Sequence, residues 1–296
     1  MNSVTTAIIP VAGLGTRVLP ASKAIPKEML PIVDKPAIQY VVEEAVAAGI
    51  KTIILVTRSG KEAIENHFDS NYELESLLMQ KGKTKVLEEV TNLVPQGVEI
   101  VSVRQDSPKG LGHAVLCARH LCQNDAFAVL LPDVLVFTNG DKTDLAEMVK
   151  QYKKSGIGQI MVEAVPDDKV QMYGIADCNG KNPEPFESVP IKGMVEKPSA
   201  KEAPSNLAMV GRYILPAQTM NILKETPPGA GNEVQLTDAL ETLLYHQSLQ
   251  AYRMGGTTFD CGNKLGYLLA NVHMGMKHPE TGEGFVKALR SMLDSK

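Results

Sequence analysis

The sequence predicts an α/β protein with a mostly parallel central sheet flanked by helices. Apolar runs of strand length alternate with helix-length amphipathic stretches through the first half of the chain, and the first apolar run stops at a glycine-rich turn. This order implies right-handed crossovers between parallel strands. Ligands of such sheets bind beyond the carboxyl ends of the strands, so we expect the loops that follow Val11, Val103 and Leu131 to converge.

Local patterns define the elements of the first half. Strands are expected at 6–11, 51–57, 98–104 and 126–131, and helices at 37–48, within two amphipathic stretches between 61 and 93, and at 112–122. The 61–93 segment is longer than a simple crossover requires, and its apolar residues recur at helical spacing from Leu74 to Val90. Core packing and a subunit contact both explain that spacing.

The second half predicts a mixed sheet, because shorter β-rich segments separated by Pro and Gly follow a helix at 144–154. These segments are 159–165, 173–178, 190–196 and 207–214. Helices are then expected at 217–224 and 235–246, a strand near 250–254, and terminal helices at 263–276 and 285–293. No internal repeat or composition break indicates a second independent domain.

Composition excludes several classes of function. With 296 residues, 44% of them hydrophobic, the chain can bury a sizeable core. Its net charge of −4 argues against a nucleic-acid partner bound by bulk electrostatics. The longest nearly apolar run, 126–137, is too short to cross a bilayer, and the N-terminus lacks a signal-peptide pattern, so no membrane association is expected. The spacing of the four cysteines argues against a zinc site or disulfide framework, which favours a reducing, cytoplasmic location.

The glycine-rich turn after the first strand suits a highly anionic ligand. Gly13 and Gly15 allow backbone N–H groups to approach a polyphosphate that a side chain would block. Positive charge is added, before any acidic residue occurs, by Arg17, Lys23 and Lys27. The alternative is an ordinary glycine turn beside surface lysines.

Two common phosphate loops do not fit this segment. A Rossmann dinucleotide fingerprint needs a third glycine that opens a helix, but Val18 stands there and prolines follow at 20, 26 and 31. A Walker loop needs Gly-Lys-Ser/Thr, which is absent.

The segment AGLGTRVLPASKAIPKEMLPIVDKP resembles the signature of the sugar-phosphate nucleotidyltransferases. Within it, KEMLP is similar to the bacterial members that act on UTP and glucose 1-phosphate. Further matching segments are ENHFD at 65–69, VRQ and KGLGHAVLCA between 103 and 118, LLPDV at 130–134, VEKP at 195–198, PSNLAMVGRY at 204–213, QLTDA at 235–239 and DCGNKLGY at 260–267. The likeness covers nearly the whole chain.

This resemblance implies a Rossmann-like fold of the nucleotide-diphospho-sugar transferase type in one domain, 1–296. The nucleotide-binding half would be 1–143, the sugar-phosphate-binding half 144–260, and the C-terminal helices 261–296 a possible subunit contact in a homo-oligomer, a dimer or tetramer. The implied reaction transfers UMP from UTP to α-D-glucose 1-phosphate by direct in-line displacement with Mg²⁺, giving UDP-glucose and pyrophosphate. The expected preference for UTP over dTTP is based on KEMLP and the 61–93 insertion. The choice between glucose 1-phosphate and galactose 1-phosphate stays open.

Such a transfer needs no general base, because the attacking phosphate oxygen is already negative; it needs cations that bring two polyanions together. Arg17 offers a planar fork to phosphate oxygens, and Lys27 a compact charge that can follow the α-phosphoryl group. Asp133 ends an apolar strand, where a cation such as Mg²⁺ would explain its carboxylate. The resemblance adds Asp260 as a second metal ligand. The alternative for Asp133 and for Asp260 is a structural role in a turn or as a helix cap.

The resemblance also assigns the substrate contacts. Loop contacts to the nucleotide are expected from Ala12, Gly13, Leu14, Gly15 and Thr16, and base contacts from Gln105 and Gly110. An amide such as that of Gln105 can act as both donor and acceptor to a pyrimidine. Sugar-phosphate contacts are expected from Gly174, Glu196, Lys197, Asn206 and Val210. Glu196 and Lys197 would point to opposite sides of a strand unless the strand ends there, as Pro198 indicates; a solvated ion pair is the alternative.

Three rival functions lack support in the sequence. A uridylyltransferase that acts through a covalent histidine needs a close pair of histidines, and the six histidines include none. An NAD-dependent dehydrogenase would need the missing third glycine. A regulatory paralogue without activity would have lost Thr16, Arg17, Lys27 or Asp133, and all of these are present.

Overall fold

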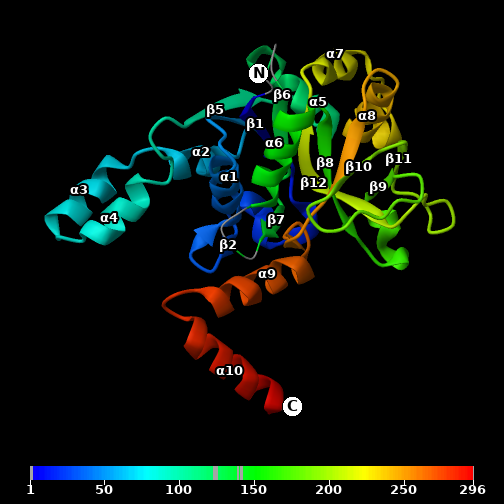
Figure 1. Cartoon of the computed structure of the whole chain (residues 1–296). Helices are drawn as coiled ribbons and strands as arrows, with labels where there is room; N and C mark the ends of the chain where they lie inside the picture. Colours follow the sequence, from blue (N-terminus) through cyan, green and yellow to red (C-terminus); the bar gives the residue numbers. More distant parts are fainter. Residues whose placement is uncertain (1–2, 123–125, 139, 141–142, 296) are drawn as a thin grey trace.

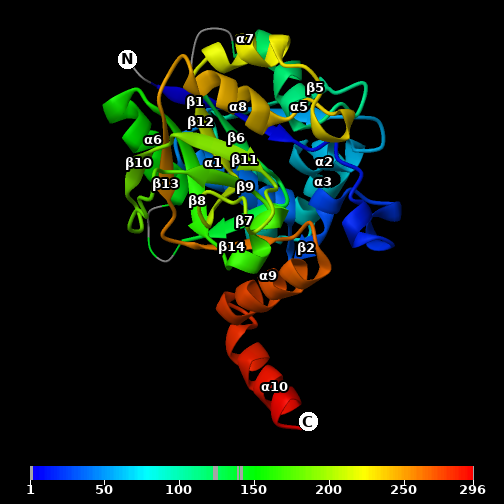
Figure 2. The same cartoon turned by 90° about the vertical axis from the view of Figure 1, so that its right-hand side faces the viewer.

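The computed structural model describes residues 3–122, 126–138, 140 and 143–295. Its centre, among these residues, is a ten-stranded sheet in the order β10-β13-β8-β12-β6-β1-β4-β5, with β9 and β11 attached beside β12. Helices cover both faces of this sheet (Figures 1 and 2). The predicted α/β class, with a largely parallel sheet in the first half and flanking helices, is confirmed.

Most of the expected segments correspond to an element whose bounds lie within a few residues of the prediction. The strands are β1 (Val4–Pro10), β2 (Pro31–Ile32), β3 (Lys35–Pro36), β4 (Thr52–Thr57), β5 (Glu99–Arg104), β6 (Ala126–Leu130), β7 (Val134–Phe137), β8 (Gly158–Ala164), β9 (Gly174–Asp177), β10 (Ser188–Pro190), β11 (Gly193–Glu196), β12 (Leu207–Leu215), β13 (Leu249–Arg253) and β14 (Thr257–Asp260). The helices are α1 (Ala37–Ala47), α2 (Glu62–Phe68), α3 (Tyr72–Gln80), α4 (Thr84–Thr91), α5 (Leu111–Cys117), α6 (Asp144–Ser155), α7 (Gln218–Glu225), α8 (Leu236–Leu244), α9 (Lys264–Lys277) and α10 (Gly282–Asp294).

The first half is parallel: β1 pairs with β4 on one side and β6 on the other, and β4 pairs with β5. Two apolar cores lie on the two faces of the sheet, one packed against α1 and α6 and the other against α5, α7 and α8. Burial on both faces explains why β1, β4 and β6 read as continuous apolar runs. Because β1 and β6 are parallel neighbours, the loops after them leave the sheet at the same edge.

The second half is a mixed sheet, as predicted. β12 runs antiparallel to both β6 and β8, whereas β13 runs parallel to β8. β9 and β11 form an antiparallel pair beside β12. The β6–β12 pairing joins the two halves in one sheet and places β12 next to the strand that leads to Asp133.

Several regions differ from the expected elements. The segment expected at 190–196 forms two strands with different partners, β10 beside β13 and β11 beside β9, and the helix expected at 112–122 ends at Cys117. The 61–93 segment forms three helices, α2 to α4, and α3 and α4 extend away from the body (Figure 1). Ile64 of α2 is buried, but of the apolar residues from Leu74 to Val90 only Leu78 is buried, while Leu74, Leu77 and Val86 are more than 40% exposed. Core packing therefore does not explain most of the helical spacing in α3 and α4. In addition, β7 pairs with β14 in a small antiparallel sheet that the sequence did not predict.

The chain ends in α9 and α10, close to the predicted helices. α10 projects away from the body in both views (Figures 1 and 2). Met292 and Leu293 near its end are 67% and 65% exposed. In the described part of the chain, no helix combines the length and apolar composition that a membrane span requires.

Candidate active site

The loop after β1 folds back so that Lys27 lies against its glycines. Gly15 has a left-handed backbone (φ 69°), and its carbonyl accepts a hydrogen bond from Ser22 Oγ at 2.6 Å. A Cβ at Gly15 would lie 3.1 Å from Lys27 Cβ, and one at Gly13 would lie 3.8 Å from Lys27 Cε. From Gly13 to Arg17 the loop is largely exposed. The sequence-predicted loop and its lysine therefore meet, with backbone accessible to a ligand.

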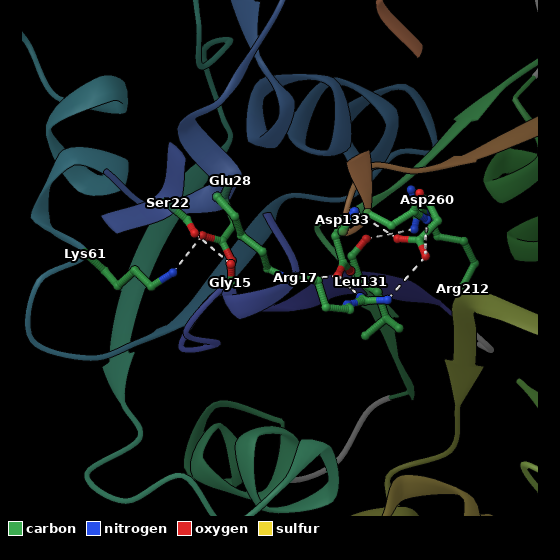
Figure 3. Close-up of polar contacts among 12 residues, drawn as sticks. Gly15, Arg17, Ser22, Glu28, Lys61, Leu131, Asp133, Arg212 and Asp260 are labelled. Atoms are coloured by element: carbon green, nitrogen blue, oxygen red, sulfur yellow. Dashed lines mark hydrogen bonds and ion pairs between the residues drawn. The ribbon is translucent and has the colours of Figure 1, made fainter. Parts of the chain in front are cut away.

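Asp133 is the centre of a charged cluster at this edge of the sheet (Figure 3). Its Oδ2 lies 2.6 Å from Lys27 Nζ and 3.3 Å from Arg17 Nη2. Burial would raise the pKa of this carboxyl, but the charge and hydrogen bond of Lys27, together with Arg17, outweigh burial and hold the pKa below its usual range. Asp133 is therefore ionised and oriented at neutral pH.

Asp260 joins the same cluster from the far end of the chain. Its Oδ2 lies 3.4 Å from Arg17 Nη1, so one guanidinium contacts both aspartates. The β7–β14 ladder places Asp260 opposite Val134, and the N–H of Cys261 donates to the carbonyl of Asp133 at 2.7 Å. The sequence indicated Asp133 by its place at the end of an apolar strand and Asp260 by resemblance alone; the structure brings the two residues together through a strand pairing.

The donor set around Asp133 and Asp260 fits Mg²⁺. Magnesium is commonly held by one or two protein carboxylates together with substrate phosphates and waters. The described residues contain no cluster of three or more His, Cys, Asp or Glu side chains able to hold a metal, so these two carboxylates would act with the nucleotide. Gly262 leaves room between them: a Cβ there would lie 2.7 Å from Asp133 Oδ2 and 2.8 Å from Asp260 Oδ1, and would also contact Arg17 Nη2.

Gln105 is held with its amide in one orientation. Its side-chain Nε2 donates to the carbonyl of Gly110 and to Nδ1 of His113, both at 3.1 Å. Burial and the charge of Lys109 lower the pKa of His113, which favours the neutral ring that can accept this bond. Both amide protons are therefore used within the protein, and the oxygen Oε1 is the group left for a base. The sequence predicted that the Gln105 amide acts as both donor and acceptor to the base, whereas in the structure only its acceptor oxygen is left for that contact.

The predicted sugar-phosphate residues lie at the end of β11. The strand ends at Glu196, and Lys197 adopts a positive φ of 48°, so the expected strand end is confirmed. Lys197 Nζ lies 3.6 Å from Glu196 Oε1, and Thr237 Oγ1 donates to Glu196 Oε2 at 2.7 Å. A Cβ at Gly174 would contact Met209 Cε and lie 3.0 Å from Glu196 Oε2, so a larger residue there would displace the end of the Met209 or the Glu196 side chain.

The remaining predicted contacts have different surroundings. Ala12 is buried, so little of it is accessible to a ligand, whereas Leu14 is 63% exposed. Asn206 precedes β12, and its carbonyl accepts a hydrogen bond from the N–H of Val165 at 3.0 Å. Val210 is 5% exposed and packs in the core, so little of its side chain is accessible.

A family model described as "Nucleotidyl transferase" matches residues 6–276. The chain belongs to the nucleotidyl transferase family. It is 52% identical over 289 residues to a UTP–glucose-1-phosphate uridylyltransferase of Haemophilus influenzae, which covers 97% of this chain and 98% of that relative. An Escherichia coli enzyme of the same name is 53% identical over 287 residues, or 96% of this chain and 94% of the relative.

Solved structures of nucleotidyl transferases agree with the fold. The UTP-bound UGPase from Acinetobacter baumannii superposes with a TM-score of 0.92 at 54% identity, covering 97% of this chain and 98% of that chain. A UDP-glucose pyrophosphorylase complexed with UDP-glucose superposes with a TM-score of 0.83 at 40% identity, covering 93% of this chain and all (100%) of that one. The predicted resemblance to bacterial uridylyltransferases is confirmed.

Several residues that support the site of this nucleotidyl transferase were not predicted from the sequence. Thr237 donates a hydrogen bond to Glu196, which lies 41 residues earlier in the sequence, and no local pattern indicates this contact. Lys61 forms a buried ion pair with Glu28, next to Lys27, at 2.7 Å (Figure 3). Arg212 had a readable signal, because a charged residue inside an apolar strand needs a buried partner.

Proposed function

We propose that the protein transfers UMP from UTP to α-D-glucose 1-phosphate, releasing UDP-glucose and pyrophosphate. The observation that carries this proposal is the cluster in which Lys27 and Arg17 meet Asp133 and Asp260 beside an exposed glycine-rich loop. The uridylyltransferase names of the relatives, and the UTP and UDP-glucose in the names of two similar structures, support the choice of substrates.

The first half of the chain binds UTP in this proposal. Backbone N–H groups of 12–16 and the guanidinium of Arg17 hold the triphosphate, and Lys27 stabilises the charge that grows as the phosphate oxygen attacks the α-phosphorus in line. No side chain needs to remove a proton, since the attacking oxygen is already ionised. Lys27 is 14% exposed and fixed by Asp133, so its ammonium is in place before the reaction begins.

Asp133 and Asp260 hold the divalent cation. When bound, Mg²⁺ supplies positive charge that offsets the two polyanions and the leaving pyrophosphate. Arg17 has 58% of its side chain exposed and lies at 3.3 and 3.4 Å from the two carboxylates, so it can turn from them to the triphosphate when a cation takes its place. Lys27, which is more buried, stays with Asp133.

Base recognition falls to Gln105. Its Oε1 accepts the N3–H of uracil, because its two amide protons are used by Gly110 and His113. Thymine carries the same N3–H, so this contact selects a uracil-type edge over cytosine without rejecting the methyl group of dTTP.

The sugar phosphate binds at the second half. Glu196, oriented by Thr237, accepts hydrogen bonds from sugar hydroxyls, and the exposed ammonium of Lys197 binds the phosphate. Gly174 leaves space for the sugar ring, and the segment from Asn206 to Val210 contributes backbone near it. The phosphate and the sugar would therefore enter from the side of β9 and β11.

The protein acts as a homo-oligomer, dimer or tetramer, in the cytoplasm. An unusually exposed apolar surface supports self-association: Leu265, Leu268 and Leu269 of α9, like the end of α10, are 48–67% exposed. All four cysteines are free, which suits a reducing compartment.

Purified protein incubated with UTP, glucose 1-phosphate and Mg²⁺ should release one pyrophosphate per UDP-glucose formed. Replacement of UTP by dTTP, and of glucose 1-phosphate by galactose 1-phosphate, measures the strictness of each site. Chelation of the metal should stop the reaction. The proposal is wrong if no pyrophosphate appears with any of these substrate pairs.

A further inference from the structure

Arg212 is a fully buried charge that lies beside the turn that carries Asp133 (Figure 3). It belongs to β12, whose residues are all buried, and its side chain is 0% exposed. Arginine is almost never found at such a position unless its charge is paired and its donors are satisfied. The partners of its guanidinium therefore indicate what it does.

Glu44 of α1 binds one side of the guanidinium. Its Oε2 lies 2.7 Å from Nη2 and 3.1 Å from Nε, and its Oε1 lies 3.0 Å from Nε. The other side donates to backbone: Nη1 to the carbonyls of Leu131 at 3.1 Å and Gly211 at 3.2 Å, and Nη2 to the carbonyl of Val134 at 2.7 Å. All five N–H donors of the fork have an acceptor, which a lysine could not reproduce.

Two of these carbonyls bracket Pro132 and Asp133. The carbonyl of Leu131 also accepts the N–H of Val134 at 3.4 Å, which closes the turn that carries Asp133. Val134 begins β7 and is the ladder partner of Asp260. The guanidinium therefore donates hydrogen bonds to both ends of the turn that carries Asp133, at Leu131 and at Val134. Val134 is also the residue paired with Asp260.

We propose that Arg212 is a positioning residue: it sets the Asp133 turn, and through β7 the distance between Asp133 and Asp260, to the spacing a divalent cation requires. It never contacts substrate. Glu44 holds the fork in the rotamer that reaches both carbonyls. This inference rests on the proposed function, because the cation it serves is the one that accompanies UTP.

A residue needed only for the core would behave differently. Replacing both members of a buried ion pair by apolar side chains is commonly neutral or stabilising, whereas removing one member leaves a buried charge unpaired. The double variant Arg212→Met/Glu44→Leu should therefore keep the fold but lose both hydrogen bonds to the turn, at Leu131 and Val134. Arg212→Lys keeps the charge opposite Glu44 and loses the planar fork.

The test measures Mn²⁺ binding, by its electron paramagnetic resonance signal, to each full-length variant in the presence of UTP. Supporting groups of this kind commonly contribute 10- to 100-fold to metal affinity, so both variants should bind Mn²⁺ about 10- to 100-fold more weakly than the parent protein. Gln159→Met is the matched control: Gln159 is 0% exposed and bonded to Gln250 of β13 and Ser188 of β10, away from the Asp133 turn. This control should lose stability and keep Mn²⁺ affinity.

Unchanged Mn²⁺ affinity in either folded variant would overturn the proposal. So would failure of both variants to fold, because Arg212 would then be a core residue without a separate role at the turn. UDP-glucose formation by the parent protein is measured in the same preparation. If the parent forms product and the variants keep their Mn²⁺ affinity, only this inference fails; if the parent forms none, the proposed function fails.

Discussion

Replacement of Lys61 by methionine should destabilise the protein through the segment that carries Lys27. The side chains of Glu28 and Lys61 are 0% and 7% exposed, and their Nζ and Oε2 atoms lie 2.7 Å apart. Among the described residues, Glu28 Oε1 has no hydrogen-bond partner, so Lys61 provides the side-chain compensation for this buried carboxylate. Without Lys61, a charge would be left unpaired beside the proposed catalytic lysine.

The size of the effect follows from this burial. Removal of one partner of a buried pair costs about 3–5 kcal/mol in the free energy of unfolding. For a chain of this size a loss of 1 kcal/mol lowers the Tm by about 2 °C, so Lys61→Met should melt about 6–10 °C lower. The exposed pair of Lys35 and Glu43, with side chains 40% and 42% exposed, gives the matched control: Lys35→Met should cost at most about 1 kcal/mol.

The deficit of Lys61→Met should also depend on pH. Burial raises the pKa of Glu28, while the charge and hydrogen bond of Lys61 counteract that rise, so the variant should raise this pKa further. A carboxyl with a raised pKa in the folded state contributes stability below its unfolded pKa of about 4.3 and loses it as the pH rises through the folded pKa. The deficit relative to the parent protein should therefore be larger at pH 8 than at pH 5.

The measurement is the free energy of unfolding in urea of Lys61→Met, Lys35→Met and the parent protein at several pH values. The double variant Lys61→Met/Glu28→Gln, which removes both charges, should lose most of this pH dependence. A deficit for Lys61→Met below about 1 kcal/mol, within the range of an exposed pair, would show that the buried pair does not stabilise this segment. A deficit that is constant with pH would show that Glu28 does not titrate as described.

Further predictions concern the site itself. Lys27→Ala should lower kcat about 100- to 1000-fold in a pyrophosphate-release assay, the range for loss of one preorganised donor; unchanged turnover would remove Lys27 from the mechanism. Gln105→Leu should raise the KM for UTP about tenfold and leave the KM for glucose 1-phosphate unchanged, whereas an equal rise in both would contradict its role at the base. Thr237→Val should raise the KM for glucose 1-phosphate about tenfold, because Glu196 loses a donor at 2.7 Å; the KM for UTP serves as control. Gly262→Ala should raise the Mg²⁺ concentration needed for half-maximal rate at near-normal stability, and an unchanged requirement would show that the space is not used.

Much of the fold was predictable because its information is local. Each buried parallel strand is an apolar run, and each helix a periodic stretch, so β1, β4, β6 and α1 lie within one or two residues of their expected bounds. The pairing of β7 with β14 was not predictable, since it joins short segments more than a hundred residues apart and depends on how the rest of the sheet closes.

The candidate site was predictable to the extent that it follows strand ends. The glycine-rich turn and Asp133 follow the neighbouring parallel strands β1 and β6, so topology alone places them at one edge of the sheet. Lys27 reaches Asp133 only because the loop after β1 folds back. The amide orientation of Gln105 depends on the ring of His113, and the turn at Asp133 depends on Arg212, so neither could be derived from spacing. A single arginine within an apolar strand nevertheless predicts a buried acidic partner, as Glu44 is for Arg212.

The most direct test of the central claim is a crystal structure with UTP and Mg²⁺ bound. The triphosphate should lie on the loop from Gly13 to Lys27, the cation should be coordinated by Asp133 and Asp260, and Arg17 should have moved from those carboxylates to the phosphates. A nucleotide bound elsewhere, or a cation held without either aspartate, would contradict that claim.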